Sequence, residues 1–221
     1  MKIPVSHGHL EAATRDPEGG VRGGAVFCHP HPVHGGTMNT KAVYRAGQAL
    51  NRVGLRVIRF NFRGVGCSTG TFDKGIGEQE DVEAALDWLE LSVREKPMVV
   101  GGISFGSMVG LTVGVEDPRV RALVGLGTPL TAYDYSFLEE TDKPVLVVQG
   151  ENDEFGSGEE VRETMGAMGD HVTVRVIPDS DHLFQDHQEE LQEAIRDFFT
   201  RGPGSGVLPE APERAAAGTR D

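Results

Sequence analysis

Cysteine and long apolar runs are both scarce in this chain. Only two of the 221 residues are cysteines, Cys28 and Cys67, which is too few for a disulfide framework. We expect both to be free thiols in a reducing compartment, one in a strand and one in a loop. No segment approaches the roughly 18 consecutive apolar residues of a membrane span, and residues 1–10 lack the apolar stretch of a signal peptide. We therefore expect a soluble, cytoplasmic protein.

Positive charge is sparse as well. The chain has 21 Lys and Arg residues against 34 Asp and Glu residues, a formal net charge of −13. Binding of nucleic acid requires clustered cations that neutralise phosphates, so we expect no nucleic-acid partner and no anionic membrane partner. The excess of negative charge is explained by solubility. We expect a small-molecule substrate as the only partner, and the sequence is compatible with both a monomer and a homodimer.

What the chain does have is a regular alternation of short apolar runs and segments of helical period. Near-continuous apolar runs predict parallel strands covered on both faces at residues 25–28, 55–60, 98–103, 122–126, 144–149 and 172–177. Between them, helices are predicted by three sets of apolar positions with 3.6-residue spacing. These sets are Val43, Ala46, Leu50 and Val53, then Val82, Leu86, Leu89 and Val93, and finally Leu191, Ile195 and Phe198.

This alternation predicts an α/β fold, a three-layer α/β/α sandwich around a mostly parallel sheet. We expect one domain over residues 1–201, with one or two weaker edge strands in residues 1–20 and with Asn39 capping the first helix. Residues 202–221 are rich in Gly, Pro and Ala and have almost no apolar periodicity. We expect this C-terminal tail to be disordered.

The stretch GGISFGS carries a G-x-S-x-G pattern at Gly102, Ser104 and Gly106. A buried strand is predicted before it and a helix after it, which is the strand–turn–helix context of a nucleophilic serine. Glycines on both sides allow the strained turn, and the start of the helix favours the developing negative charge. The pattern alone is common, and its alternative is a serine in an ordinary strand–helix turn. In this context it predicts Ser104 as the nucleophile.

A serine needs a base to remove its proton, and the base needs a carboxylate that orients it. His182 follows the predicted strand 172–177, whereas His171 precedes that strand and His187 falls in the last helix. The predicted strand 144–149 is followed by an acidic loop that contains Asp153. Ser104, Asp153 and His182 follow one another in the order expected when a nucleophilic serine, its acid and its base come from successive loops of a parallel sheet.

Two other acids share the loop of Asp153. Glu151 and Glu154 are its close neighbours, and each of the three could be a solvated loop charge. We favour Asp153 as the acid because of its place in the loop.

The segment HPHPVHGG, residues 29–36, places His29, His31 and His34 close together. A catalytic zinc would require three protein ligands, and no further cluster with ligand-like spacing appears, so we expect no metal and no cofactor. Pro30 and Pro32 lack a backbone N–H, which leaves His31 as the only donor between them. Such a fixed N–H, at the carboxyl end of a strand, meets the needs of an oxyanion hole. We predict the backbone N–H groups of His31 and Phe105 as oxyanion donors, with His29 and His34 in structural or rim positions.

With these residues placed, the chain resembles the α/β-hydrolase superfamily, and more narrowly small, lidless bacterial hydrolases related to dienelactone hydrolases and carboxylesterases. The motifs that carry the resemblance are HPHPVHGGTMNTKAV, RFNFRGVGCSTGTFDKGIGEQEDVEAAL, GGISFGS, GENDEF and DSDHLF, in that order over about residues 25–200. The resemblance implies Ser104 as nucleophile, Asp153 as acid, His182 as base, and His31 and Phe105 as oxyanion donors. Dienelactone hydrolases proper use a cysteine nucleophile, and this chain has Ser104 in its place.

The segment RFNFRG, with Asn61 and Arg63, also belongs to the motifs that carry the resemblance. We interpret both side chains as supports of the loop backbone, and we interpret Cys67 as inert.

Only about 17 residues separate the strand 122–126 from the next one, which leaves no room for a lid. We therefore expect an open, shallow site, walled in part by Tyr133, Tyr135 and Phe137.

The sequence as a whole predicts a serine hydrolase that cleaves carboxylic esters of short acyl chain through a Ser-His-Asp triad. A thioesterase or small-substrate peptidase would use the same residues. A non-catalytic binding module on a hydrolase fold and a metallohydrolase built on the histidine cluster are the two alternatives of other classes.

Overall fold

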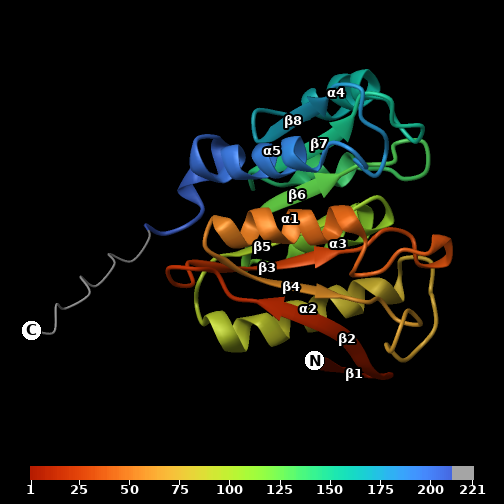
Figure 1. Ribbon diagram of the computed structural model, residues 1–221, viewed down its shortest axis with the longest axis vertical. Coiled ribbons are helices and arrows are strands. Elements are labelled where there is room, and N and C mark those ends of the chain that lie inside the picture. Colours follow the sequence, from red (N-terminus) through yellow and green to blue (C-terminus); the bar gives the residue numbers. More distant parts are fainter. Residues whose placement is uncertain (211–221) are drawn as a thin grey trace, which may run out of the picture.

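The computed structural model describes residues 1–210, which form an eight-stranded sheet with helices on both faces (Figure 1). The strands are ordered β1-β2-β4-β3-β5-β6-β7-β8. β1 and β2 are antiparallel to their neighbours, and all pairs from β4 to β8 are parallel. The strand bounds are β1 Lys2–Val5, β2 Gly8–Arg15, β3 Gly23–Cys28, β4 Leu55–Phe60, β5 Met98–Ile103, β6 Val120–Leu126, β7 Val145–Gly150 and β8 Val172–Ile177.

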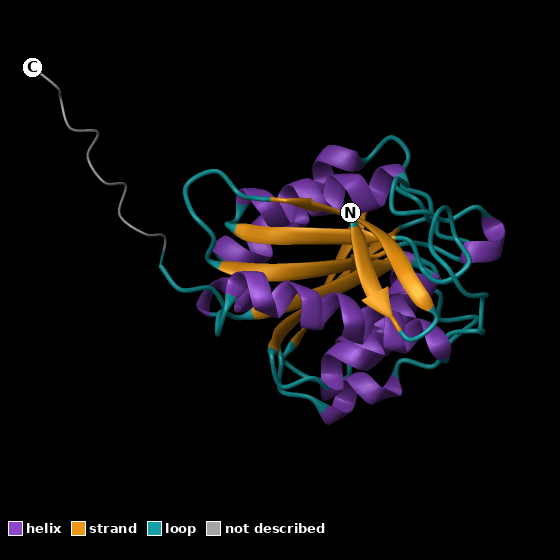
Figure 2. Ribbon diagram, turned by 90° about the horizontal axis from the view of Figure 1, so that it is seen from below, coloured by secondary structure: helices purple, strands orange, loops and turns teal. Residues whose placement is uncertain are grey.

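Within residues 1–210, five α-helices make the two outer layers, which lie above and below the strands in Figure 2. Their bounds are α1 Lys41–Arg52, α2 Gly77–Val93, α3 Phe105–Glu116, α4 Gly158–Gly166 and α5 Gln188–Thr200. α1 and α5 share one apolar core with the sheet, and α2, α3 and α4 share the other. The predicted inner faces of α1, α2 and α5 are buried throughout. The three-layer α/β/α sandwich and the edge strands near the N-terminus are therefore confirmed.

The start of α1 differs from the prediction. The N-cap is Thr40 rather than Asn39, and it makes no side-chain capping bond to the helix. The Thr40 hydroxyl instead accepts the N–H of Thr37, and the Thr37 hydroxyl accepts the N–H of Asn39. A threonine-based turn therefore replaces the expected asparagine cap.

The C-terminal tail also differs from the prediction in its first part. Pro203–Gly206 forms a 3-10 turn, and Leu208 is only 5% exposed within the core beneath α1 and α5. Arg22 anchors the segment by donating from Nε to the carbonyl of Pro209 at 2.7 Å. Two apolar side chains, Val207 and Leu208, are enough to dock a segment whose composition indicates disorder. The remainder of the predicted tail, residues 211–221, lies outside the described residues.

The loops that follow the parallel strands gather at one edge of the sheet, on the right in Figure 1. The connection from β6 to β7 covers residues 127–144 and contains only the short 3-10 turn Ser136–Glu140. No lid domain is therefore inserted there. Among the described helices, none is long and apolar enough to cross a membrane.

Candidate active site

Ser104 lies in a sharp turn between β5 and α3. Its φ of 57° and ψ of −126° are strained for a residue with a side chain. A Cβ on Gly102 would collide with the Gly106 carbonyl group, and one on Gly106 would collide with the carbonyl oxygen of His29. Both flanking positions of the motif therefore require glycine, and the tight turn lifts Ser104 above the sheet edge.

His182 and Asp153 lie next to Ser104 although they are far away in the sequence. The Nε2 atom of His182 is 2.9 Å from the Ser104 Oγ, and its Nδ1 is 2.8 Å from the Asp153 Oδ2. His182 is 7% exposed and Asp153 is 3% exposed. The carboxylate fixes the proton on Nδ1, which leaves Nε2 free to accept the serine proton. The structure thus brings together the three residues that the sequence picked out, in hydrogen-bonding order.

The two competing acids take other positions. Glu151 accepts the backbone N–H of Asp179 at 2.9 Å, and Glu154 is exposed to solvent. Only Asp153 of this loop bonds to His182, and its Oδ1 also accepts the N–H of Phe155 at 2.9 Å. The loop backbone therefore holds the carboxylate in the orientation that the imidazole needs.

Gln149, at the end of β7, is a supporting residue that sequence reasoning missed. Its Nε2 donates to Asp153 Oδ2 at 2.7 Å and to the carbonyl of Gly156 at 2.8 Å. Its Oε1 accepts both the N–H and the hydroxyl of Thr128, at 2.8 and 2.9 Å. The signal in the sequence was a glutamine at the end of an apolar run, because a polar side chain that is buried there, as Gln149 is, needs hydrogen-bond partners.

Ser107 and Tyr135 form a second buried support. The Ser107 hydroxyl donates to the Ser104 carbonyl at 2.7 Å and lies 2.7 Å from the Tyr135 hydroxyl, which is placed to donate to it. Burial raises the pKa of Tyr135 above its usual range, so its hydroxyl stays protonated. Tyr135 therefore supports the turn that carries Ser104 from within the core, and the expectation that it forms a wall of the site is wrong.

The other two predicted wall residues also lie elsewhere. Phe137 packs against Tyr135, with ring centroids 5.8 Å apart, and Tyr133 packs against Phe105 at 6.4 Å. Neither side chain lines the cavity above Ser104 in the described part of the chain. The 3-10 turn of the β6–β7 connection draws these aromatics into the core on the α3 side instead.

The side chains of the two residues predicted to supply oxyanion donors pack against each other. The rings of His31 and Phe105 have centroids 5.0 Å apart, and Phe105 is the first residue of α3. Within the described residues, neither backbone N–H donates to a protein acceptor. An oxyanion needs two such N–H groups, and the dipole at the start of α3 would favour its charge, so both donors stay a prediction.

His29 has a defined structural task. It is completely buried; its Nε2 accepts the N–H of Phe62 at 3.0 Å, and its Nδ1 donates to the carbonyl of Pro30 at 2.6 Å. Desolvation lowers the pKa of His29 to about 4, so the ring is neutral at pH 7. It clamps the loop after β3, which carries His31, to the loop after β4. A structural position was predicted, but not this link between loops.

The other two histidines of the segment face a different environment. The rings of His31 and His34 lie 4.7 Å apart at the rim, and burial lowers the pKa of His31. Among residues 1–210, no three His, Cys, Asp or Glu side chains are grouped so that they could hold a metal ion.

Asn61 supports loop backbone, as predicted, whereas the same prediction for the Arg63 side chain is wrong. Asn61 accepts the N–H of Met38 at 2.8 Å, which fixes the loop before α1. The Arg63 guanidinium donates to the buried carboxylate of Asp81 at 2.9 Å, so it ties its loop to α2 rather than to loop backbone. Neither side chain lines the cavity at Ser104 in the described residues.

A cavity of about 270 Å³ opens above Ser104 and His182. Its remaining walls come from the loops after β3, β7 and β8. They are Pro30, His31 and His34, then Glu154 and Phe155, and finally Asp181, Leu183 and Gln185. Larger hollows exist elsewhere on the surface, but none of them contains a nucleophile with a hydrogen-bonded base in the described part of the chain.

Comparison with known proteins agrees with this architecture. A family model described as "Alpha/beta hydrolase domain" matches residues 26–198. An alpha-beta serine hydrolase homologue from Coxiella burnetii is 34% identical, with a TM-score of 0.83 over 89% of this chain and 94% of that one. A serine hydrolase without a lid from Xanthomonas campestris is 30% identical, with a TM-score of 0.85 over 96% and 95%. An uncharacterised protein of Rickettsia prowazekii is 35% identical over 79% of this chain and 77% of its own length. The chain belongs to the alpha/beta hydrolase family and is similar to its small serine hydrolases without a lid.

Proposed function

We propose that this protein is a serine esterase that cleaves carboxylic esters of short acyl chain. The observation that carries the proposal is the hydrogen-bonded chain Asp153–His182–Ser104, which ends in an open cavity. A cavity of about 270 Å³ lies at the small end of ligand sites, which run from roughly 300 to 1,000 Å³, and favours small substrates. Two free thiols, Cys28 and Cys67, agree with a reducing, cytoplasmic setting.

The reaction would run in two halves. His182 takes the proton of Ser104 through Nε2 while Oγ attacks the ester carbonyl carbon. The N–H groups of His31 and Phe105 hold the oxygen of the tetrahedral intermediate, and Asp153 stabilises the imidazolium. His182 then gives its proton to the departing alcohol oxygen. In the second half, water loses a proton to His182 and attacks the acyl-enzyme, which releases the carboxylic acid and restores Ser104.

The test is hydrolysis of p-nitrophenyl butyrate together with labelling by a fluorophosphonate. We expect Ser104→Ala to lose both, with a decrease in kcat of roughly 10⁴-fold or more. Ser92→Ala, at a half-buried position near the end of α2, is the matched control and should keep full activity. Undiminished turnover in Ser104→Ala would refute the proposal, and a wild-type protein that takes no label would point to a non-catalytic binding module.

Thioesters and small amides would be attacked by the same atoms. Comparing kcat/KM for butyryl esters, thioesters and anilides decides among these acyl groups. Loss of activity with a chelator would instead support a metallohydrolase. A preference for esters over thioesters is the outcome we expect, because no Lys or Arg among the described lining residues offers a cation for a phosphorylated thiol carrier.

A further inference from the structure

The charge around the cavity above Ser104 is one-sided. Glu154 and Asp181 both line it, and no Lys or Arg does so within the described residues. A cation close by is Lys41 at the start of α1; its Nζ donates to the backbone carbonyl of Gln185 at 2.8 Å, and the side chain does not line the cavity. Burial lowers the pKa of His31, which favours its neutral form. The carboxylates of Glu154 and Asp181 are therefore matched by no Lys or Arg side chain in the described lining of the cavity.

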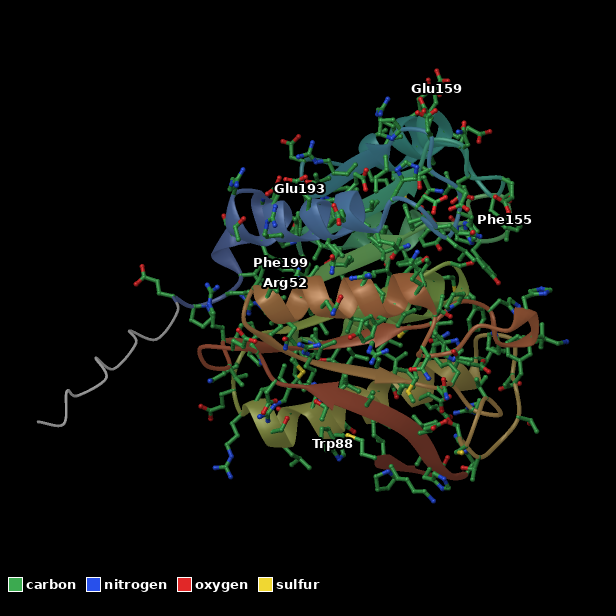
Figure 3. All side chains as sticks on the ribbon, in the orientation of Figure 1. Arg52, Trp88, Phe155, Glu159, Glu193 and Phe199 are labelled. Carbon is green, nitrogen blue, oxygen red and sulfur yellow. The ribbon has the colours of Figure 1, made fainter. Side chains whose placement is uncertain are left out.

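An aromatic ring completes this surface. Phe155 is 42% exposed, and its ring packs edge-on against the His182 imidazole with centroids 4.7 Å apart. Figure 3 places Phe155 at the end of the sheet where the loops gather. A half-exposed aromatic ring next to carboxylates is a favourable setting for an alkylammonium group.

One part of the cavity adjoins His182, and this is the part in which we place the departing alcohol. Asp181, Leu183 and Gln185 come from the loop of His182 itself, and Phe155 touches the His182 ring. His182 gives its proton to the alcohol oxygen, so the alcohol must be next to Nε2 when the ester bond breaks. The group attached to that oxygen then extends between Phe155 and the two carboxylates.

We propose that this cavity selects esters of cationic alcohols, of the type of an amino alcohol or quaternary ammonium alcohol, over neutral and anionic ones. The inference rests on the proposed esterase function and adds the chemical class of the leaving group. An ester or lactone that carries a carboxylate would be disfavoured, since it would meet Glu154 and Asp181 with no counter-charge among the described lining residues.

The experiment compares butyrylcholine with 3,3-dimethylbutyl butyrate. These two esters share the acyl group and the shape of the alcohol, and they differ in one charged nitrogen that replaces carbon. Because the charge also activates the leaving group, the decisive quantity is the change in their kcat/KM ratio between wild type and variants. Competitive inhibition by choline and by 3,3-dimethylbutanol, measured against p-nitrophenyl butyrate, reports binding without that effect.

Glu154→Gln and Asp181→Asn remove charge and keep shape. Glu154 makes no side-chain hydrogen bond within residues 1–210. Asp181 accepts the Gln185 N–H at 3.0 Å, and the amide oxygen of the asparagine variant can still accept it. We expect each variant to lower the choline-to-neutral ratio by about two- to threefold, and the pair to lower it by about fivefold, at low salt. The advantage of choline over 3,3-dimethylbutanol as an inhibitor should fall by the same factor.

Glu159→Gln is the matched control. Glu159 lies on α4, away from Phe155 in Figure 3, and the substitution removes the same charge from a residue that does not line the cavity. Its ratio should stay within the error of the wild type. An unchanged choline-to-neutral ratio in the Glu154 and Asp181 variants, or an equal fall of this ratio in Glu159→Gln, would overturn the inference. The esterase proposal would still stand in that case, provided that the neutral ester is hydrolysed. A protein that cleaves neither ester and takes no fluorophosphonate would overturn both.

Discussion

At His31, two substitutions can distinguish the role of the backbone N–H from the role of the side chain. Its φ of −52° falls within the range that a proline ring imposes, so proline can replace it without bending the loop. His31→Pro removes the N–H that we assign to the oxyanion hole, whereas His31→Ala keeps it. Both variants lose the same contact, the Nδ1 atom that accepts the Val33 N–H at 3.3 Å. The pair therefore isolates one hydrogen-bond donor.

We expect kcat for p-nitrophenyl butyrate to fall by about 10²–10³-fold in His31→Pro and by less than about tenfold in His31→Ala. KM should change little in both, because the oxyanion exists only in the transition state. Circular dichroism of both variants checks the fold. Equal losses in the two variants would mean that the imidazole, not the N–H, is the important group.

His29 makes a prediction about pH and stability. Its pKa is lowered to about 4 in the folded protein, and the unfolded chain has the ordinary value of about 6.5. Between these values the unfolded state binds a proton that the folded state does not, so stability rises with pH across this window. The His29 contribution is thus complete above pH about 6.5 and is lost as the pH falls towards 4, by about 3 kcal/mol in total.

The measurement is urea unfolding of the wild type and of His29→Asn between pH 7.5 and 4.5. The amide introduced by the substitution can still donate to the Pro30 carbonyl, but it does not titrate. The stability difference between the two proteins should shrink steadily below pH 6.5, since all other groups titrate alike in both. A difference that stays constant with pH would show that His29 is not held neutral by its burial.

At the scale of helices and strands, most of the fold could be predicted from local sequence patterns. The runs at β4, β5 and β8 matched the structure to the residue. β5 is buried along its whole length, as its continuous apolar sequence indicates, whereas β8 at the edge of the sheet is only partly covered. The strand–elbow–helix context placed Ser104, and chain order alone placed the other two members next to it. The strands and the turn at Ser104 could be predicted because each depends on a pattern that is complete within a few residues, whereas the positions of Asp153 and His182 followed from the order of the strands.

The hydrogen bonds that support the site could not be predicted, because they depend on how the loops fold and not on a local sequence pattern. The bond from Gln149 to Asp153 depends on a loop that folds back on its own strand. The contact between Ser107 and Tyr135 joins α3 to the β6–β7 connection, 28 residues apart. A polar residue in a buried run shows that a partner must exist, but its partner is set by the tertiary packing.

For the whole molecule, the C-terminal segment closes one end of the core on the α1–α5 side. Leu208 shares that core with Leu55 and Phe198, and Arg22 holds the chain beside it through Pro209. Composition predicted a segment without structure because only Val207 and Leu208 are apolar there. Docking two such side chains offsets the entropy of ordering a short segment when the surface that receives them is already formed.

Leu208→Ala tests this closure. We expect the variant to lose about 1–3 kcal/mol of unfolding free energy, measured by urea denaturation, because truncation of a buried leucine leaves a cavity in the core. Leu91→Ala, at a 77% exposed position of α2, is the control and should change stability by less than about 0.5 kcal/mol. The site lies at the opposite edge of the sheet, so kcat/KM for p-nitrophenyl butyrate should stay at the wild-type level in both variants at room temperature. A Leu208→Ala protein as stable as the wild type would mean that residues 203–208 rest on the core without contributing to it.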